Sequence, residues 1–170
     1  LFNDKRGVKM DKFIRKLFVS LSPTMLISKH LNTKYDYAFA VGKAASLMMQ
    51  TARELNPLKD YLVISPYTLS IDEKNLKSTH PIPDDLSLVA GERLADFVAS
   101  LPRDAKCLAL ISGGASSSVV KLNSETNFKV YVKELSDLIY SNNSIETINK
   151  FRAAKSVIKN GGLNPESNLY

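Results

Sequence analysis

Apolar residues recur at helical spacing in several stretches of the chain. The first stretch places apolar side chains three and four residues apart, with lysine and arginine between them, and predicts an amphipathic helix over about residues 10–21. Ser22-Pro23 is typical of an N-cap followed by proline in the first turn, and predicts a second, short helix that ends near His30. Four later stretches predict helices over 43–55, from Asp84 or Asp85 to about 101, over 128–139, and over 144–159.

Short apolar runs between these stretches predict buried strands. Three such runs cover residues 37–41, 61–65 and 106–111, and glycine or proline follows each of the first two. Between residues 70 and 85 the sequence turns polar and carries two prolines, which predicts a loop with a brief strand over about 76–79.

Strands that alternate with helices of ten or more residues predict a mostly parallel sheet with helices on both faces. The expected fold class is therefore α/β, a three-layer α/β/α sandwich of the Rossmann-like kind, with residues 1–170 forming one domain. In such sheets the ligand binds beyond the carboxyl ends of the strands. The loops that follow the predicted strands are thus the places to look for chemistry.

Composition narrows the functional class. The chain is 44% apolar and 24% charged, which is ordinary for a globular domain. Its single cysteine, Cys107, excludes an intramolecular disulfide and lies in an apolar run, which predicts a buried, unreactive thiol. No run approaches the roughly 18 apolar residues of a membrane-spanning helix, and no signal-peptide core is present, so we expect a cytoplasmic protein without membrane partners.

The net charge of +6 favours anionic partners. The lysines are spread along the chain and the aromatic residues follow apolar periodicities, so nucleic-acid binding is not expected. Only two histidines occur, and no carboxylates pair at ligand spacing, so no metal site built by the protein is expected. His30, near a predicted helix end, is most simply a partner of the helix dipole.

Two glycine-containing segments are candidates for anion binding. In the first, Gly42 permits a tight turn after a strand and Lys43 follows at the start of a helix, where an ammonium group and the helix dipole both favour phosphate or carboxylate. A solvated lysine beside a structural glycine is the alternative. The second candidate follows the strand over 106–111, and its glycines let backbone N–H groups converge while its serines add hydroxyl donors. Its residues are Ser112, Gly113, Gly114, Ala115, Ser116 and Ser117.

That second segment lacks the Gly-Lys-Ser/Thr of a Walker A loop and is no full dinucleotide fingerprint, so a purely structural turn stays open. The third candidate is His80, in a loop stiffened by Pro81 and Pro83. Its alternative is a loop histidine bonded to nearby backbone.

The last predicted helix carries a basic stripe. Arg152, Lys155 and Lys159 are spaced to share one face, with Asn149 nearby, and Gly161-Gly162 is expected to end the helix. Such a stripe either binds an anion or is simply solvated.

Together these pieces resemble the N-terminal domain of the type II glycerate kinases, a family often misnamed as hydroxypyruvate reductases. Four segments occur in the family's order between residues 38 and 163. They are Val41-Gly42-Lys43-Ala44-Ala45 with Met48, Thr79-His80-Pro81-Ile82-Pro83-Asp84 with Ser87 and Ala90-Gly91, Leu110-Ile111-Ser112-Gly113-Gly114-Ala115-Ser116, and Ile145-Glu146-Thr147-Ile148-Asn149 followed by Arg152, Ser156, Lys159 and Gly161-Gly162.

The resemblance implies a kinase that uses ATP and Mg²⁺ to phosphorylate D-glycerate to 2-phosphoglycerate, in a cleft between this domain and a second one. It places Lys43 at the active site, where the ammonium would neutralise phosphoryl or carboxylate charge. It assigns anion binding to the loop from Ser112 to Ser116, with Gly42 in the adjoining turn. Asn149, Arg152 and Lys159 would then help to line the cleft.

The chain departs from the family pattern at three points. Ala154-Lys155-Ser156 stands where the family usually has His-Leu-Ser, and Leu163 stands where an arginine usually follows Gly-Gly. The family chains also continue well beyond the equivalent of Tyr170, through an acidic segment and a C-terminal domain. We therefore expect that a second domain or chain is needed for turnover, and a homodimer stays open. The alternatives are a non-catalytic anion- or nucleotide-binding module and a phosphosugar-binding domain of the isomerase type.

Overall fold

The computed structural model describes residues 5–20, 22–31, 33–68, 71–159 and 161–163. Its centre is a parallel sheet of four strands in the order β3-β2-β1-β4. The register pairs Tyr37 with both Asp60 and Cys107, so β1, β2 and β4 end at the same edge. The strands are β1 (Tyr37–Val41), β2 (Asp60–Ser65), β3 (Asn75–Lys77) and β4 (Cys107–Ile111).

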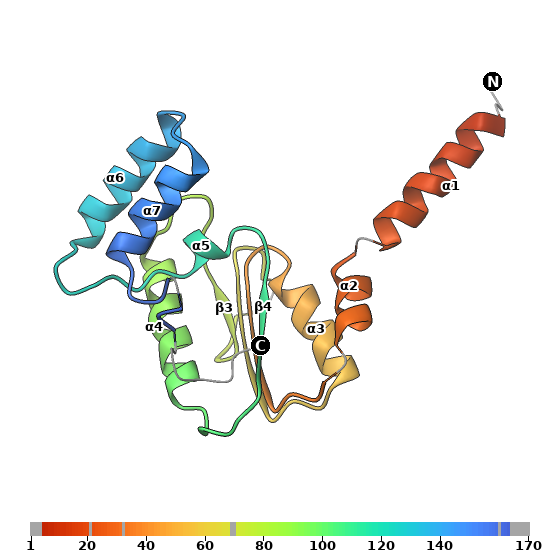
Figure 1. Cartoon of the computed structure of the whole chain (residues 1–170), viewed down its shortest axis with the longest axis horizontal. Helices are drawn as coiled ribbons and strands as arrows, with labels where there is room; N and C mark the ends of the chain where they lie inside the picture. Colours follow the sequence, from red (N-terminus) through yellow and green to blue (C-terminus); the bar gives the residue numbers. More distant parts are fainter. Residues whose placement is uncertain (1–4, 21, 32, 69–70, 160, 164–170) are drawn as a thin grey trace.

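Helices cover both faces of this sheet. Figure 1 shows α2 and α3 on one face and α4 on the other, with α6 and α7 side by side above α4 and α1 projecting from the opposite flank. The helices are α1 (Lys5–Ser20), α2 (Pro23–His30), α3 (Ala45–Leu55), α4 (Asp85–Ala99), α5 (Ala115–Ser118), α6 (Phe128–Tyr140) and α7 (Ile145–Lys155). The expected three-layer parallel α/β fold is confirmed.

Alternation along β1 explains the three layers. Phe39 and Val41 point to one side and join the apolar cluster beneath α4, whereas Ala38 and Ala40 point to the other and join the cluster beneath α2 and α3. All four side chains are buried, because both faces of a parallel sheet are covered. A third cluster, centred on Tyr131 and Leu135, holds α6 and α7 together.

Helix starts agree with the capping residues expected from the sequence. The Ser22 hydroxyl accepts a hydrogen bond from the backbone N–H of Met25, with Pro23 in the first turn of α2. Asp84 caps α4 through the N–H groups of Leu86 and Ser87, in a reciprocal capping box. Most strand and helix bounds fall within two residues of prediction, although α1 begins earlier, at Lys5, and the short α5 was not expected.

The end of α7 is a correction. We expected a helix over 144–159 stopped by Gly161 and Gly162, but α7 ends at Lys155. There Ser156 turns into an antiparallel bridge with Leu122, and its hydroxyl donates to the carbonyl of Lys121. This tertiary pairing offers the backbone better partners than another helical turn, so the helix stops before the glycines.

The Cys107 thiol is buried as expected, and burial raises its pKa to about 12. A thiol that stays protonated at neutral pH is a poor nucleophile. Among the described residues, no helix combines the length and the apolar character needed to cross a bilayer.

Close contact between α4 and the end of α5 depends on Gly91. A Cβ at this position would lie 2.1 Å from the carbonyl oxygen of Val120. Gly91→Ala should therefore lower the free energy of unfolding by about 1–3 kcal/mol through overpacking, measured by urea denaturation. Asp96→Ala on the exposed face of the same helix is the matched control and should change stability little. Equal stability of the two variants would contradict this packing.

Candidate functional site

Two loops interlock at the carboxyl edge of the sheet. The turn after β1 carries Gly42, whose φ of +116° favours glycine. A Cβ on Gly42 would lie 2.5 Å from the hydroxyl oxygen of Ser112 and 2.6 Å from its carbonyl oxygen. In addition, the backbone N–H of Lys43 donates to the carbonyl of Gly113 at 2.9 Å. The two loops therefore hold one another in place, and glycine at position 42 is a steric requirement.

The Ser112 hydroxyl is part of this interlock. It accepts from the backbone N–H of Ala44 at 3.1 Å and donates to the carbonyl of Val41 at 3.3 Å. Sequence reasoning expected this hydroxyl to face an anion. Its hydrogen bonds tie the end of β4 to the end of β1 and the start of α3, and so fix the turn that carries Lys43.

His80 and Lys43 meet at Gly114. This glycine has a φ of +90°, and a Cβ there would lie 2.8 Å from the His80 ring and 3.3 Å from Cγ of Lys43. Within the described part of the chain, no acceptor pairs with the backbone N–H groups of Gly113 and Gly114. The structure thus brings together three segments that the sequence suggested separately, beside two free backbone donors.

Two further cations approach from the far end of the chain. The Lys159 ammonium donates to the carbonyl of Ser116 at 3.1 Å. Burial, and to a smaller degree the charge of Arg152, lowers the Lys159 pKa to about 8. Burial also lowers the Arg152 pKa, and its Nε atom is buried without a hydrogen-bond partner.

The electrostatics connect these groups into one cluster, which we call the cation cluster: Lys43, His80, Arg152 and Lys159. Burial lowers the His80 pKa, and the charges of Lys43 and Arg152 lower it further. These effects all favour the uncharged imidazole of His80. In the described residues, no carboxylate forms an ion pair with the three charged members of the cluster. Like charges, two of them on the partly desolvated Arg152 and Lys159, without a counter-charge make a site that is complementary to an anion.

The last helix contributes differently from the expectation. Lys159 lies four residues beyond the end of α7, so it cannot share a helical face with Arg152 and Lys155. It reaches the cluster because the chain turns back after Ser156 and passes α5. Asn149 is exposed on α7, about one turn before Arg152.

The sequence did not reveal the side chains that support His80 and Arg152. Thr79 donates to the Asp84 carboxylate at 2.9 Å and pairs with the Ser87 hydroxyl at 2.8 Å, which fixes the loop that carries His80; the His80–Pro81 peptide bond is cis. Asp84 and Ser87, three residues apart, were the available signal. Tyr131 is buried near Arg152 with its hydroxyl unpartnered, and only its helical periodicity was visible in the sequence.

The structure accounts for Leu163, one of the two local departures from the pattern described above. Ser156, the residue that matches, serves the bridge that ends α7. Leu163 packs against the apolar cluster beneath α4 and lines a cavity of about 240 Å³ beside Ser116 and Lys159. Its role here is packing, so the cluster receives no arginine from that position.

Metal binding finds no support from the described residues. They include no group of three or more histidine, cysteine, aspartate or glutamate side chains placed to hold an ion. The cation cluster itself would repel Mg²⁺. The residues present therefore fit an anion but do not fit a metal site of their own.

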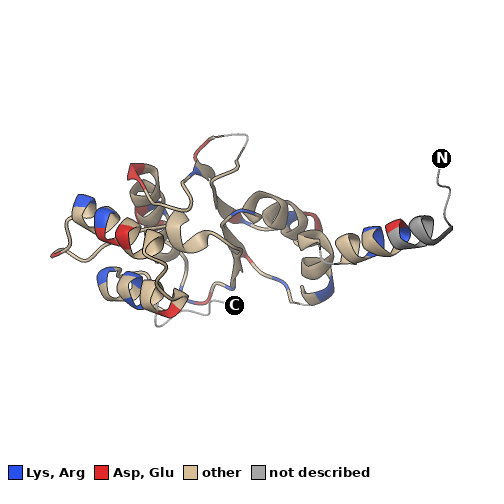
Figure 2. Ribbon diagram, turned by 90° about the horizontal axis from the view of Figure 1, so that it is seen from above, with Lys and Arg blue, Asp and Glu red and all other residues tan. Residues whose placement is uncertain are grey.

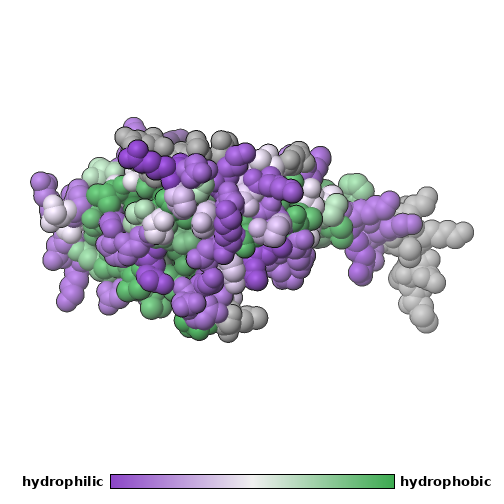
Figure 3. All heavy atoms as spheres, turned by 90° about the horizontal axis from the view of Figure 1, so that it is seen from below, coloured by the Kyte–Doolittle hydropathy of each residue, from purple (hydrophilic) through white to green (hydrophobic). Residues whose placement is uncertain are grey.

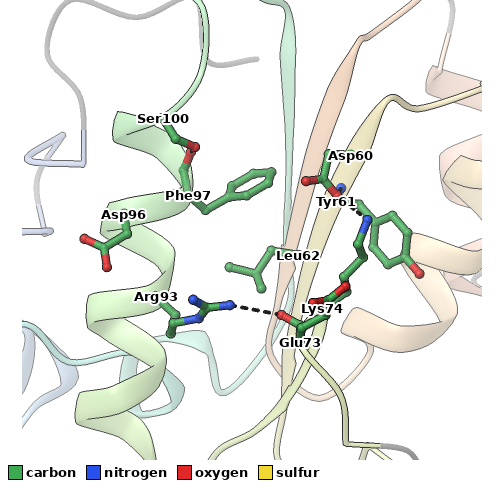
Figure 4. A pocket seen from close by; sticks show the side chains of 9 residues that line it. All are labelled: Asp60, Tyr61, Leu62, Glu73, Lys74, Arg93, Asp96, Phe97 and Ser100. Atoms are coloured by element: carbon green, nitrogen blue, oxygen red, sulfur yellow. Dashed lines mark hydrogen bonds and ion pairs between the residues drawn. The ribbon is translucent and has the colours of Figure 1, made fainter.

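A second, larger hollow lies at the opposite edge. It measures about 460 Å³ and opens between α4 and the amino end of β2 (Figure 4). On the strand side of the hollow the Lys74 ammonium pairs with the Asp60 carboxylate at 2.7 Å, and from α4 Arg93 donates across it to the carbonyl of Glu73 at 3.3 Å. Its charged groups are thus partly paired with one another, and it lies at the amino end of β2, whereas the cation cluster lies at the carboxyl edge of the sheet.

Fold and site together define a three-layer α/β domain with a cationic loop cluster at the carboxyl edge of its sheet. The chain belongs to the family described as "Domain of unknown function (DUF4147)", whose pattern matches residues 8–167.

Relatives with names support the resemblance seen in the sequence. The chain is 32% identical over 137 residues to D-glycerate 2-kinase of Thermotoga maritima, covering 77% of this chain and 33% of that protein. The crystal structure of a glycerate kinase from Thermotoga maritima superimposes with a TM-score of 0.79 at 28% identity, over 89% of this chain and 39% of that one. A crystal structure of a Pyrococcus horikoshii protein has the same fold, with a TM-score of 0.81 at 19% identity, over 99% of this chain and 43% of that one.

The chain thus spans about a third of the length of its curated relative. Residues 8–167, which the family pattern matches, include all four members of the cation cluster.

The Lys159 pKa is directly measurable. Because burial lowers it to about 8 from an ordinary 10.5, the Lys159 side-chain resonances should titrate near pH 8 by NMR, and near 10.5 in urea. Lys159→Met assigns the signal. Between pH 8 and 10.5 the unfolded chain binds the extra proton, so this group makes the fold more stable as the pH rises through that window. A folded-state midpoint above pH 10 would show that Lys159 is solvated.

Proposed function

We propose that this chain supplies the anion-binding half of a glycerate kinase, which uses ATP to phosphorylate D-glycerate to 2-phosphoglycerate in the cytoplasm. The observation that carries the proposal is the cation cluster, which lies where ligands bind in parallel α/β sheets. The names of the similar proteins supply the substrate class. The proposed ligands are therefore a small glycerate-like anion and a nucleotide.

The proposed roles follow from position and charge. Lys43, exposed on the turn after β1, is the proposed catalytic residue, whose ammonium neutralises charge on the carboxylate or on the transferred phosphoryl group. Gly42, Ser112 and Ala115 shape the loops that present it. The free N–H groups of Gly113 and Gly114 donate to anionic oxygens.

Arg152 and Lys159 are proposed to bind the same anion from the other side. Arg152 offers a partly buried guanidinium whose Nε has no hydrogen-bond partner. A buried donor without a partner costs free energy, which a bound anion would recover. Lys159, held by the carbonyl of Ser116, adds a second charge. Asn149, one turn earlier on α7, is proposed to line the same side of the cleft as Arg152 and Lys159. His80, against Gly114 and with its pKa lowered, is proposed to form one hydrogen bond to the ligand.

Catalysis is proposed to need a second domain or chain. In the described residues no carboxylate cluster could hold Mg²⁺. Phosphoryl transfer depends mainly on positioning and charge stabilisation. We therefore assign the metal and part of the nucleotide site to the completing half, and the anion grip to this chain. A non-catalytic anion-binding module is the second candidate, favoured by the same lack of clustered carboxylates.

A fusion protein tests the proposal. This chain should replace the matched region of the Thermotoga maritima kinase, and ADP release should be followed with ATP, Mg²⁺ and D-glycerate. We expect glycerate-dependent release from the fusion and none from this chain alone. Lys43→Ala should lower turnover by roughly 100-fold or more, since it removes a charge that stabilises the transition state.

Lys106→Ala is the matched control, because Lys106 lies exposed just before β4, at the opposite edge of the sheet. It should leave turnover within about twofold of the parent fusion. If the fusion binds D-glycerate by calorimetry but releases no ADP, the chain is a binding module. If phosphosugars bind more tightly than glycerate and ATP, the isomerase-type alternative replaces the kinase.

A further inference from the structure

The first helix carries an apolar face that the rest of the chain does not cover. Four apolar residues of α1 form two adjacent pairs about one turn apart, and all four are exposed: Phe13, Ile14, Leu17 and Phe18. The two phenylalanine side chains are 62% and 73% exposed. A stripe of this kind normally packs on a core. Here α1 contacts α2 at its end and projects away from the sheet (Figure 1).

Lys12, Arg15 and Lys16 lie beside this apolar stripe, and the sequence of α1 is strongly basic. The helix holds six basic residues and one acidic residue, a net charge of +5. Its one carboxylate, on Asp11, is already paired with Arg15 at 3.0 Å. Figure 2 shows the blue positions along this helix, and Figure 3 shows that the side of α1 facing the amino edge is mainly hydrophilic. The apolar stripe is thus bordered by cations.

The position of α1 suits a contact with the second domain or chain that is proposed to complete the cleft. Figures 1 and 2 show α1 and the α6–α7 pair on opposite flanks of the sheet. Figure 1 also shows that both reach past the carboxyl ends of the strands, where the cation cluster lies. A body that covers the cluster would therefore stand between these two flanks, beside the apolar stripe.

Two observations favour the completing domain over a second copy of this chain as the partner of α1. A second copy of the chain would bring two helices of charge +5 together, which is unfavourable without intervening acidic groups. The Pyrococcus horikoshii structure matches 99% of this chain, α1 included, yet this chain covers only 43% of it. More than half of that protein thus lies outside the matched part and is available to cover the helix.

We propose that α1 is the docking element for the domain or chain that completes the cleft. The partner surface is apolar, to receive Phe13 and Phe18, and is rimmed by carboxylates that face the basic residues of α1. This inference rests on the proposed function for the identity of the partner. The docking surface itself is a separate claim with its own readout.

Hydrogen exchange measures this surface without relying on activity. In the isolated chain, peptides from residues 11–20 should exchange fast, because nothing covers α1. In the fusion with the remainder of the Thermotoga maritima kinase, the same peptides should exchange at least about tenfold more slowly. Phe13→Ser with Phe18→Ser should return exchange in the fusion to the rate of the isolated chain.

The matched control is Tyr140→Ser on α6. Tyr140 is also 73% exposed but lies away from α1, so its loss should leave the protection of α1 unchanged. Lys12→Glu with Lys16→Glu should lower the protection as well, since both reverse the charges that face the carboxylate rim.

The outcomes separate this inference from the proposed function. Protection of α1 without ADP release supports docking and overturns the kinase assignment. ADP release with unprotected α1 supports the kinase and overturns docking. Co-sedimentation of the isolated chain with phosphatidylserine vesicles, lost in the double phenylalanine variant, would also overturn docking, because α1 would then be a lipid-binding helix.

Discussion

The candidate site depends on the interlock between the turn after β1 and the loop after β4. Gly42 can approach Ser112 only because it has no Cβ, and the bond from the Lys43 N–H to the Gly113 carbonyl closes the contact. Adjacent parallel strands bring the two loops together, since Val41 and Ile111 are partners in the register. Everything proposed for Lys43 and the free N–H groups of Gly113 and Gly114 assumes this rigid junction.

Charge then determines what the junction is suited to bind. Arg152 and Lys159 are partly buried, and this burial lowers the pKa of both side chains. A fold gains nothing from such desolvation in the absence of a ligand, so the cost is typical of a functional site. The unpaired Arg152 Nε and Tyr131 hydroxyl agree with this interpretation. These features support the proposal that the fold supplies one half of a binding cleft.

Much of the fold was predictable because local signals agreed with tertiary structure. Apolar runs marked the strands, and Ser22 and Asp84 marked helix starts through caps that need only neighbouring residues. The end of α7 was not predictable, because Ser156 leaves the helix for a partner 34 residues away, Leu122. For the same reason the sequence indicated Arg152 and Lys159 as cations but could not show that Lys159 reaches Ser116 from outside the helix.

A double-mutant cycle tests most directly whether Lys43 and Arg152 grip one anion. The Kd of inorganic phosphate should be measured by calorimetry for the chain and for Lys43→Met, Arg152→Met and the double variant. If both cations contact the same ion, each single change weakens binding by roughly tenfold, and the two effects are not additive. A Kd that is unchanged in both single variants would contradict the central claim that these residues form one anion site.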